Sequence, residues 1–410
     1  MQEMRHARAL RMLAASLLVG GCAQQQVVTT AGSPRAGSTL AAITVDDLKS
    51  RLYAYADDSM MGREAGTIGN AMATTYIAAE AARIGLEPAG DNGTWFQDIQ
   101  SSSARLAGSI APGTARNVIG MLRGSDPVLR SEYVAIGAHN DHVGFRSPPL
   151  DHDSLRAFNL ALARLGAPSW DRSEPSEKRA AAVAAARVNM DSLRRLRPAR
   201  LDSIRNGADD DGSGTVTVLE IAEALASAPV KPRRSILFVW HTAEEKGLLG
   251  AKWFTEHPTV PRASIVAQLN LDMVGRGSAS DITGGGPDYL QLVGSRRVST
   301  QLGDIVEQVN AARPRPFVFD YNYDANGHPE RIYCRSDHYM YARYGIPVAF
   351  FTTGLHADYH QITDEPQYID YDHMRRVADF VRDVTLRVAN LDRPPRVDKP
   401  AGAPDAPCVQ

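Results

Sequence analysis

The sequence predicts an α/β protein, a three-layer sandwich around a central mixed, mostly parallel sheet. From residue 116 onward, short apolar segments rich in Val, Ile, Leu and Phe alternate with longer segments of helical pattern. Strands of this kind are buried on both faces between layers of helices. The 410 residues are 43% hydrophobic and 22% charged, an ordinary globular composition that allows one large domain or two small ones.

Residues 1–21 have the organisation of an export signal. Arg5, Arg8 and Arg11 precede an apolar stretch that is too short to span a bilayer. The stretch ends in Val-Gly-Gly before Cys22, which resembles a bacterial lipobox and predicts a lipid anchor at Cys22, with an ordinary cleaved signal as the alternative. Residues 22–40 are expected to be a flexible tether. We therefore expect an exported lipoprotein at the cell envelope.

The main domain is expected over 41–392. Capping residues at 44–47 open a helix to about residue 56, and a helix over 68–84 ends at Gly85. Apolar runs and helical periodicity predict the elements that follow. The predicted strands are 117–122, 133–139, 235–241, 264–272 and 346–352, and the predicted helices are 213–228, 247–256, 299–312 and 369–390.

Residues 147–205 interrupt this alternation and are interpreted as a helical insertion. One helix is predicted from Glu177 to Arg197, where Pro198 stops it, and 177–205 carries eight basic against three acidic residues. A solvated helical segment and a lid over the active site both remain open. The Pro-rich residues 393–410 are expected to be a disordered tail.

Charge and cysteine content exclude several classes of function. Lys and Arg total 45 and Asp and Glu total 47, a net charge of −2, so the basic excess typical of nucleic-acid binders is missing and no nucleic-acid partner is expected. Three cysteines cannot form a disulfide framework or a thiolate zinc cluster. Any metal must therefore be held by histidines and carboxylates. Whether Cys334 and Cys408 form a disulfide is left open.

Side chains that can bind metal gather in five short segments, each where a predicted strand ends. These are GAHNDHVG (137–144), GADDDGSG (207–214), HTAEEKGLLGA (241–251), LNLDMVG (269–275) and DYHQITDE (358–365). His139 and Asp141 are two residues apart in an extended stretch, so they can face the same site. Asp272 lies inside an apolar strand, where a carboxylate is costly unless it is paired or metal-bound.

The five segments are more informative together than singly. Two histidines and three or four carboxylates can converge at one sheet edge, where ligand sites are common. Imidazole and carboxylate ligands suit Zn²⁺, with Mn²⁺ or Co²⁺ as alternatives. A solvated acidic turn or a calcium loop remains open for 209–211, and the first turn of a helix remains open for Glu244 and Glu245.

In this order, the five segments resemble peptidase family M28, in its bacterial aminopeptidase type with two metal ions. The resemblance covers about 45–390 apart from 147–205. It implies a zinc-aminopeptidase-like fold, two Zn²⁺ ions and peptide substrates with a free N-terminus. It further implies that Asp210 bridges both metals and is joined to Asp211 by a cis peptide bond. The other implied metal ligands are His139 and Asp272 at one ion and Glu245 and His360 at the second.

The resemblance also implies roles around the metals. Glu244 would be the general base, and Asp141 would orient His139. Residues 336–338 resemble a segment near the family's substrate pocket, which gives Asp337 and His338 a role beside the substrate or in support of the site. The remaining histidines near these segments are interpreted as surface or supporting groups: His142, His152, His241 and His356.

Other functions remain open on the same fold. A glutaminyl-cyclase-like acyltransferase would use one zinc ion and a Trp-lined pocket, whereas this chain has Tyr359 before His360. A non-catalytic surface lipoprotein would have lost ligands or the base, and this chain retains all six residues. Carboxypeptidase and dipeptidase variants of the same chemistry are also open.

Overall fold

The computed structural model describes residues 39–100, 114–168, 176–277, 282, 284–399 and 402–410. The predicted export signal, Cys22 and most of the predicted tether lie outside these residues, so the prediction of a lipid anchor stays a prediction. Within the described part of the chain, no helix combines the length and the apolar character needed to cross a membrane.

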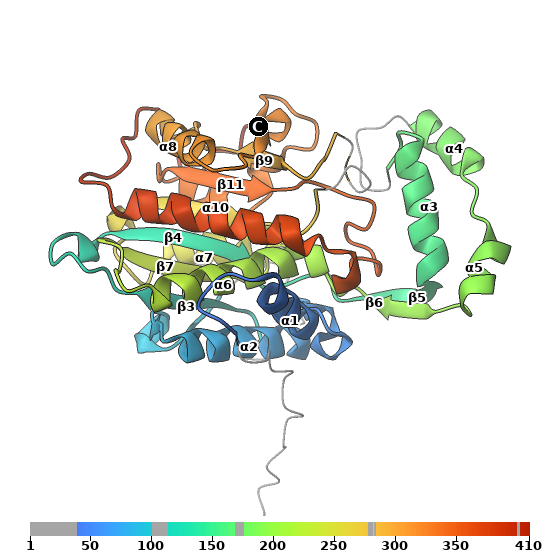
Figure 1. Cartoon of the computed structure of the whole chain (residues 1–410), viewed down its shortest axis with the longest axis horizontal. Helices are drawn as coiled ribbons and strands as arrows, with labels where there is room; N and C mark the ends of the chain where they lie inside the picture. The colour runs from blue at the N-terminus through green and yellow to red at the C-terminus, as the bar shows by residue number, and fades with distance from the viewer. Residues whose placement is uncertain (1–38, 101–113, 169–175, 278–281, 283, 400–401) are drawn as a thin grey trace, which may run out of the picture. The chain divides into compact units, whose positions relative to one another are not determined.

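A mixed sheet forms the centre of the fold (Figure 1). Among the described residues it contains nine strands, in the order β1-β3-β7-β4-β8-β11-β9-β10, with β2 paired to β3. The strands are β1 (Glu87–Pro88), β2 (Phe96–Asp98), β3 (Arg116–Leu122), β4 (Tyr133–His139), β7 (Ser235–His241), β8 (Ile265–Leu271), β9 (Tyr289–Val293), β10 (Val318–Asp320) and β11 (Val348–Thr352). The central strands β7, β4, β8 and β11 are parallel, and β3 and β9 flank them in antiparallel pairing. The predicted fold class is therefore confirmed.

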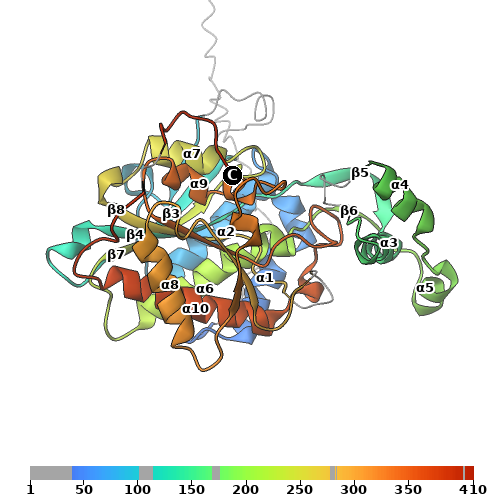
Figure 2. The same ribbon diagram turned by 90° about the horizontal axis from the view of Figure 1, so that it is seen from above.

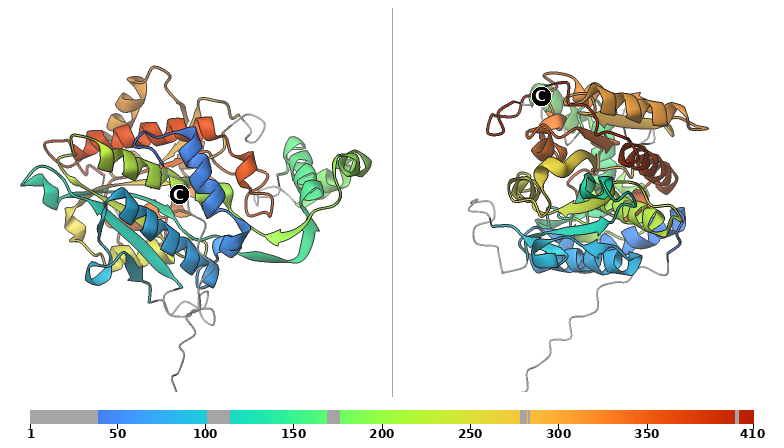
Figure 3. Two further views of the ribbon diagram at one scale, coloured as in Figure 1. Left: turned by 60° about the horizontal axis from the view of Figure 1, so that its bottom comes forward. Right: turned by 90° about the vertical axis from the view of Figure 1, so that its left-hand side faces the viewer.

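Helices cover both faces of this sheet. Along β4, Val134 and Ile136 enter one buried cluster and Ala135 enters another, as the alternation of side chains in a strand requires. The first cluster includes residues of α1 (Val45–Tyr55), α2 (Ile68–Ile84), α6 (Gly214–Ser227), α8 (Thr300–Ala311) and α10 (Tyr371–Ala389). The second includes residues of α7 (Leu249–Glu256) and α9 (His338–Ala342). Figure 3 shows α10 and α7 on opposite sides of the strands.

The insertion is built on a second, two-stranded sheet. β5 (Phe145–Asp151) pairs antiparallel with β6 (Leu201–Ile204), and α3 (His152–Arg164), α4 (Ser176–Ala185) and α5 (Met190–Leu196) follow one another between them (Figure 2). The prediction of one helix over 177–197 is wrong. Asn189 separates α4 from α5, because its side chain accepts a hydrogen bond from the Ser192 amide and caps the start of α5.

The C-terminal residues are held against the main domain. Cys408 forms a disulfide with Cys334, and the Gln410 side-chain amide donates to the carbonyl oxygens of Tyr323 and Ala325. The prediction of a disordered tail is therefore wrong for 402–410, and the disulfide that the sequence left open is present. The low hydrophobicity of this segment gave no sign that a covalent link would fix it.

Candidate metal centre

The parallel strands bring the predicted segments to one edge of the sheet. His139 is the last residue of β4, and Asp272 directly follows β8. Glu244 and Glu245 follow β7, the neighbour of β4 on its other side. His360 lies in the segment after β11. Since the carboxyl ends of parallel strands meet at one edge, residues far apart in sequence become neighbours there.

One cluster of donor atoms consists of His139, Asp210 and Asp272. His139 Nε2 lies 3.1 Å from Asp210 Oδ1 and 3.6 Å from Asp272 Oδ1. Each of the three residues offers an atom within 4.8 Å of the others, a spacing that could hold one metal ion.

A second cluster uses the other oxygen of Asp210. His360 Nε2 lies 3.0 Å from both Asp210 Oδ2 and Glu245 Oε1. His142 completes the group, with its Nδ1 3.0 Å from Glu245 Oε1 and 3.7 Å from Asp210 Oδ2. The two oxygens of Asp210 therefore face different clusters, as a carboxylate that bridges two ions must.

The three adjacent aspartates at 209–211 face different partners. The Asp211 carboxylate accepts hydrogen bonds from the amides of His139, Gly214 and Met273. Asp209 accepts from the Gly275 amide and faces His356. Asp210 alone of the three points into the clusters, and the Asp210–Asp211 peptide bond is cis. The segment is buried, so the alternative of a solvated acidic turn is wrong.

Glu244 lies beside the first cluster and is held by Asp141. The Glu244 amide donates to Asp141 Oδ1 at 3.0 Å, and Glu244 Oε2 lies 4.0 Å from His139 Nε2. His139 Nδ1 is 3.1 Å from the backbone oxygen of Asp141 but 3.7 Å from its carboxylate. Asp141 thus orients His139 through its carbonyl oxygen and positions Glu244 through its side chain.

The ionisable groups perturb one another strongly. Burial acts to raise the pKa of Asp210, but His139 and His360 outweigh it and hold that pKa well below its ordinary range. Burial and Asp210 act to raise the pKa of Glu245, whereas His360 and His142 lower it to about 2. Burial acts to lower the pKa of His360, but Glu245 and Asp210 raise it to about 10. The centre therefore attracts positive charge, as protons or as cations.

Glu244 shows the opposite balance. Burial raises its pKa well above the ordinary range; His139 opposes this effect, and the negative charges of Glu245 and Asp272 add to it. A carboxylate that holds a proton this readily suits acid–base chemistry.

The donor atoms of both clusters fit metal ions. His139 Nε2, His142 Nδ1 and His360 Nε2 are buried atoms with no hydrogen-bond partner among the described residues, and so are Asp210 Oδ2 and Glu245 Oε1. Leaving such atoms unpartnered is costly unless a ligand satisfies them. Imidazole nitrogens with carboxylate oxygens are a donor set that zinc accepts.

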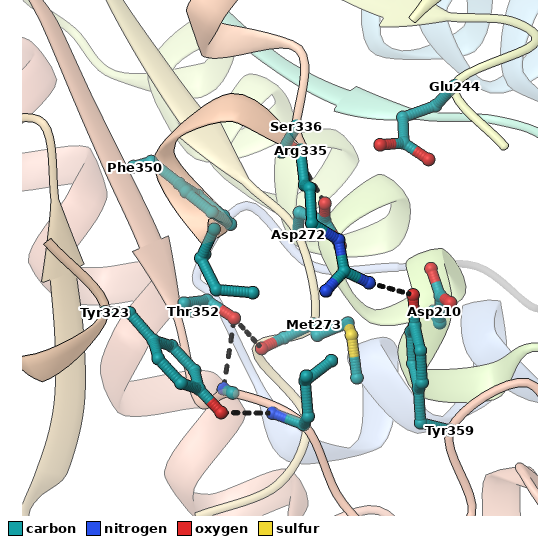
Figure 4. Close-up of a pocket in the computed structure, with 13 residues that line it drawn as sticks. Asp210, Glu244, Asp272, Met273, Tyr323, Arg335, Ser336, Phe350, Thr352 and Tyr359 are labelled. Atoms are coloured by element: carbon teal, nitrogen blue, oxygen red, sulfur yellow. Dashed lines mark hydrogen bonds between the residues drawn. The ribbon is translucent and has the colours of Figure 1, made fainter. Parts of the chain in front are cut away.

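A pocket opens beside the clusters (Figure 4). Glu244, Asp210 and Asp272 contribute its acidic wall, and apolar side chains line much of the opposite part: Met273, Tyr323, Ile332, Phe350 and Leu355. Polar residues also line it, among them Ser336, Thr352 and Tyr359. Arg335 lies between the two parts in this view and donates a hydrogen bond of 3.1 Å to the hydroxyl of Tyr359. In the described chain, the insertion contributes no residue to this pocket.

Comparison with known proteins decides the family. The sequence pattern of peptidase family M28 matches residues 117–385, about two thirds of the chain. The chain belongs to peptidase family M28. The family implies metal ions, and the two clusters are consistent with a dinuclear site.

Curated relatives agree with this assignment, and solved structures share the fold. Leucine aminopeptidase 1 of Aspergillus fumigatus is 32% identical over 180 residues, which are 41% of this chain and 43% of that protein. The chain spans about half the length of the curated relatives it matches, or less. A leucine aminopeptidase precursor from Bacteroides thetaiotaomicron has a similar fold, with a TM-score of 0.54, 17% identity, and coverage of 84% of this chain and 97% of that one. A glutaminyl cyclase from the same organism gives a TM-score of 0.51 at 17% identity over 84% and 98% of the two chains.

Within this M28 chain, the structure does not bring Asp337 or His338 to the pocket. Asp337 is buried, with its carboxylate 3.3 Å from His241 Nδ1. The ring of His338 stacks on Phe350, and burial and Arg297 lower its pKa to about 3. Of the two roles that the sequence left open, support of the pocket wall therefore fits both residues, and contact with substrate does not.

His142 and Arg335 are the site residues that the sequence interpretation missed. Of the two positions that the sequence leaves open for His142, the structure excludes the surface, because the residue is buried and belongs to the second cluster. It lies three residues after His139, beyond the end of β4, in an isolated parallel β-bridge with Glu64, where the alternation of β4 no longer predicts side-chain direction. The signal in the sequence that points to His142 is its position in the metal-binding segment GAHNDHVG. Arg335 directly precedes the segment at 336–338, whose first residue also lines the pocket.

Proposed function

We propose that this chain is an exported dinuclear zinc aminopeptidase that removes N-terminal residues from peptides. The observation that carries the proposal is the pair of donor clusters sharing Asp210, with Glu244 beside one of them. Membership of peptidase family M28 and the leucine aminopeptidases among its relatives support this activity.

Two zinc ions would be held by the two clusters, with Mn²⁺ or Co²⁺ as alternatives. His139, Asp210 and Asp272 would hold one ion, and Asp210, Glu245 and His360 the other. When bound, the ions supply Lewis acidity for the scissile carbonyl and for the attacking water.

The chain's own residues supply the proton transfers and the binding of substrate. Glu244 takes a proton from the attacking water and passes it to the leaving amine. The carboxylates of Glu244 and Asp272 both line the pocket and attract a free α-ammonium group. This favours substrates with an unblocked N-terminus.

The pocket wall suits an apolar N-terminal side chain. Ile332, Phe350 and Leu355 offer it apolar surface, and burying a side chain such as Leu there is worth about 1.5–3 kcal/mol. The hydroxyl of Tyr359 accepts a hydrogen bond from Arg335. Its own hydrogen is therefore available to a substrate oxygen in the pocket.

Export and anchoring at Cys22 form part of the proposal and rest on the sequence of residues 1–40. A glutaminyl-cyclase-like reaction remains the main alternative, because the fold is shared with both classes of enzyme. The two functions differ in metal content, since a cyclase would bind one zinc ion per chain and the aminopeptidase two.

Hydrolysis of aminoacyl p-nitroanilides by zinc-loaded protein tests the proposal. Leucyl p-nitroanilide should be cleaved, its N-acetyl derivative should not, and glutaminyl peptides should not be cyclised. Glu244→Gln should lower kcat by about 10²–10⁴-fold and leave two zinc ions bound, because Glu244 is the base and not a ligand.

Glu87→Gln provides a matched control, since Glu87 is an exposed carboxylate paired with Arg123. It should behave as the unaltered chain. Near-normal turnover by Glu244→Gln would contradict the role of Glu244, and cleavage of the N-acetyl substrate at an equal rate would contradict the aminopeptidase type.

A further inference from the structure

The ring of His142 is fixed in place by its surroundings. The side chain is fully buried, and its backbone amide donates to the carbonyl oxygen of Arg63. Gly207 has a φ of +54°, and a Cβ atom there would lie 2.5 Å from His142 Cγ. The ring meets that of His360 edge to face, with centroids 5.4 Å apart. This packing fixes the direction in which the His142 ring points.

The His142 ring points into the second donor cluster. Neither ring nitrogen of His142 has a hydrogen-bond partner among the described residues, and the same holds for Asp210 Oδ2, Glu245 Oε1 and His360 Nε2. Four contacts join these atoms, three of 3.0 Å and one of 3.7 Å. In a tetrahedral zinc site with bonds of about 2.0–2.1 Å, neighbouring donor atoms lie about 3.3 Å apart.

We propose that His142 is a direct ligand of the second metal ion, through Nδ1. The inference rests on the proposed dinuclear centre, and it gives the two metal ions different numbers of protein ligands. Four protein atoms would surround the ion at Glu245 and His360, whereas three would hold the ion at His139 and Asp272. The chain would then have one closed and one open metal site.

This inequality has a functional consequence. Closed four-ligand sites are typical of structural zinc, and catalytic sites keep a position open. The ion in the four-ligand site would bind more tightly and fill first. Substrate oxygen would then be received mainly at the three-ligand site, which is also the cluster that Glu244 adjoins.

Metal titration of His142→Ala tests the assignment. The unaltered chain should bind two zinc ions per molecule, and the variant should lose about 10–100-fold or more in affinity for one of them, since even residues that only support ligands contribute that much. His152→Ala is the matched control, because His152 is equally buried but lies on α3, outside both clusters. It should keep both affinities.

X-ray absorption of the cobalt-loaded, unaltered chain gives a second measurement that does not depend on the folding of a variant. Three imidazoles per two cobalt ions are expected, and two would overturn the proposal. Unchanged affinities in a folded His142→Ala would overturn it as well. Binding of fewer than two ions by the unaltered chain would instead contradict the dinuclear centre on which the proposed function depends.

Discussion

Arg63 shows how a single buried residue supports the metal centre from outside it. The side chain is fully buried, and its guanidinium donates hydrogen bonds to the carbonyl oxygens of Tyr55, Asn206 and Gly207. The last two residues begin the segment that carries Asp210. Arg63 therefore fixes the approach of the backbone to the bridging carboxylate without facing either cluster.

Replacing Arg63 should destabilise the whole fold. Arg63→Met retains much of the apolar stem but removes a donor from three buried carbonyl oxygens. The Gly207 oxygen still accepts from the Gly212 amide, and each buried acceptor left unsatisfied costs about 1–3 kcal/mol. We expect a loss of about 3 kcal/mol or more in the free energy of unfolding, measured by urea denaturation. Arg123→Met, at an exposed ion pair with Glu87, should cost less than about 1 kcal/mol. Equal losses in the two variants would contradict the role of Arg63.

For single residues, the sequence predicted the metal-binding groups better than the buried side chains that pack around them. His139, Asp210, Glu245, Asp272 and His360 could be proposed as ligands because strand ends and a family resemblance both point to them. Arg63 could not be found, because its acceptors are backbone carbonyls that any sequence provides. The position of His142 in the second cluster could not be predicted, because it is set by a β-bridge with Glu64 and by packing against Gly207, which are tertiary features.

Among the elements, those with strong local signals were predictable. The Gly85 stop of α2 is observed, with a φ of 88°, and the five predicted strands are all present. β10 and β1 were missed because they have three and two residues, and such short strands are defined by their partners in the sheet. The pairing of β5 with β6 was likewise invisible, since it joins residues about fifty positions apart.

Helix α3 of the insertion contacts the segment that carries His360. Arg156 on α3 lies 3.4 Å from Asp358, two residues before His360, and stacks on Tyr368. Asp358 also pairs with Arg276 at 3.0 Å and accepts from Thr363. The segment that carries His360 is thus held by contacts within the main domain, to which Arg156 adds a contact from the insertion.

Removal of the insertion helices should therefore leave the metal centre intact. Asp151 and Leu201 are partners in the β5–β6 pair, so a short turn can replace residues 152–200. We expect two bound zinc ions, hydrolysis of leucyl p-nitroanilide within about threefold of normal, and a melting temperature lower by a few degrees. Arg156→Ala should reproduce that decrease. A folded but metal-free product would show instead that the insertion helps to build the site.

For the molecule as a whole, the metal centre concentrates negative charges that bound protons or metal ions neutralise. Zinc should therefore stabilise the folded chain as well as activate it. A free zinc concentration of 100 times the dissociation constant contributes about 2.7 kcal/mol, which corresponds to roughly 5 °C in melting temperature for a domain of this size.

The size of this stabilisation should depend on pH, because protons and zinc compete for the same imidazoles. Without metal, neighbouring carboxylates raise the pKa of His360 to about 10 and also raise that of His139, so protons are bound where zinc would bind. Zinc must displace these protons, so zinc affinity rises with pH, by up to about tenfold per pH unit for each proton released. Calorimetric titration at pH 6, 7 and 8, in buffers of different ionisation enthalpy, measures both the affinity and the proton release. An affinity that does not change with pH, or zinc binding without proton release, would contradict this account of the charge balance.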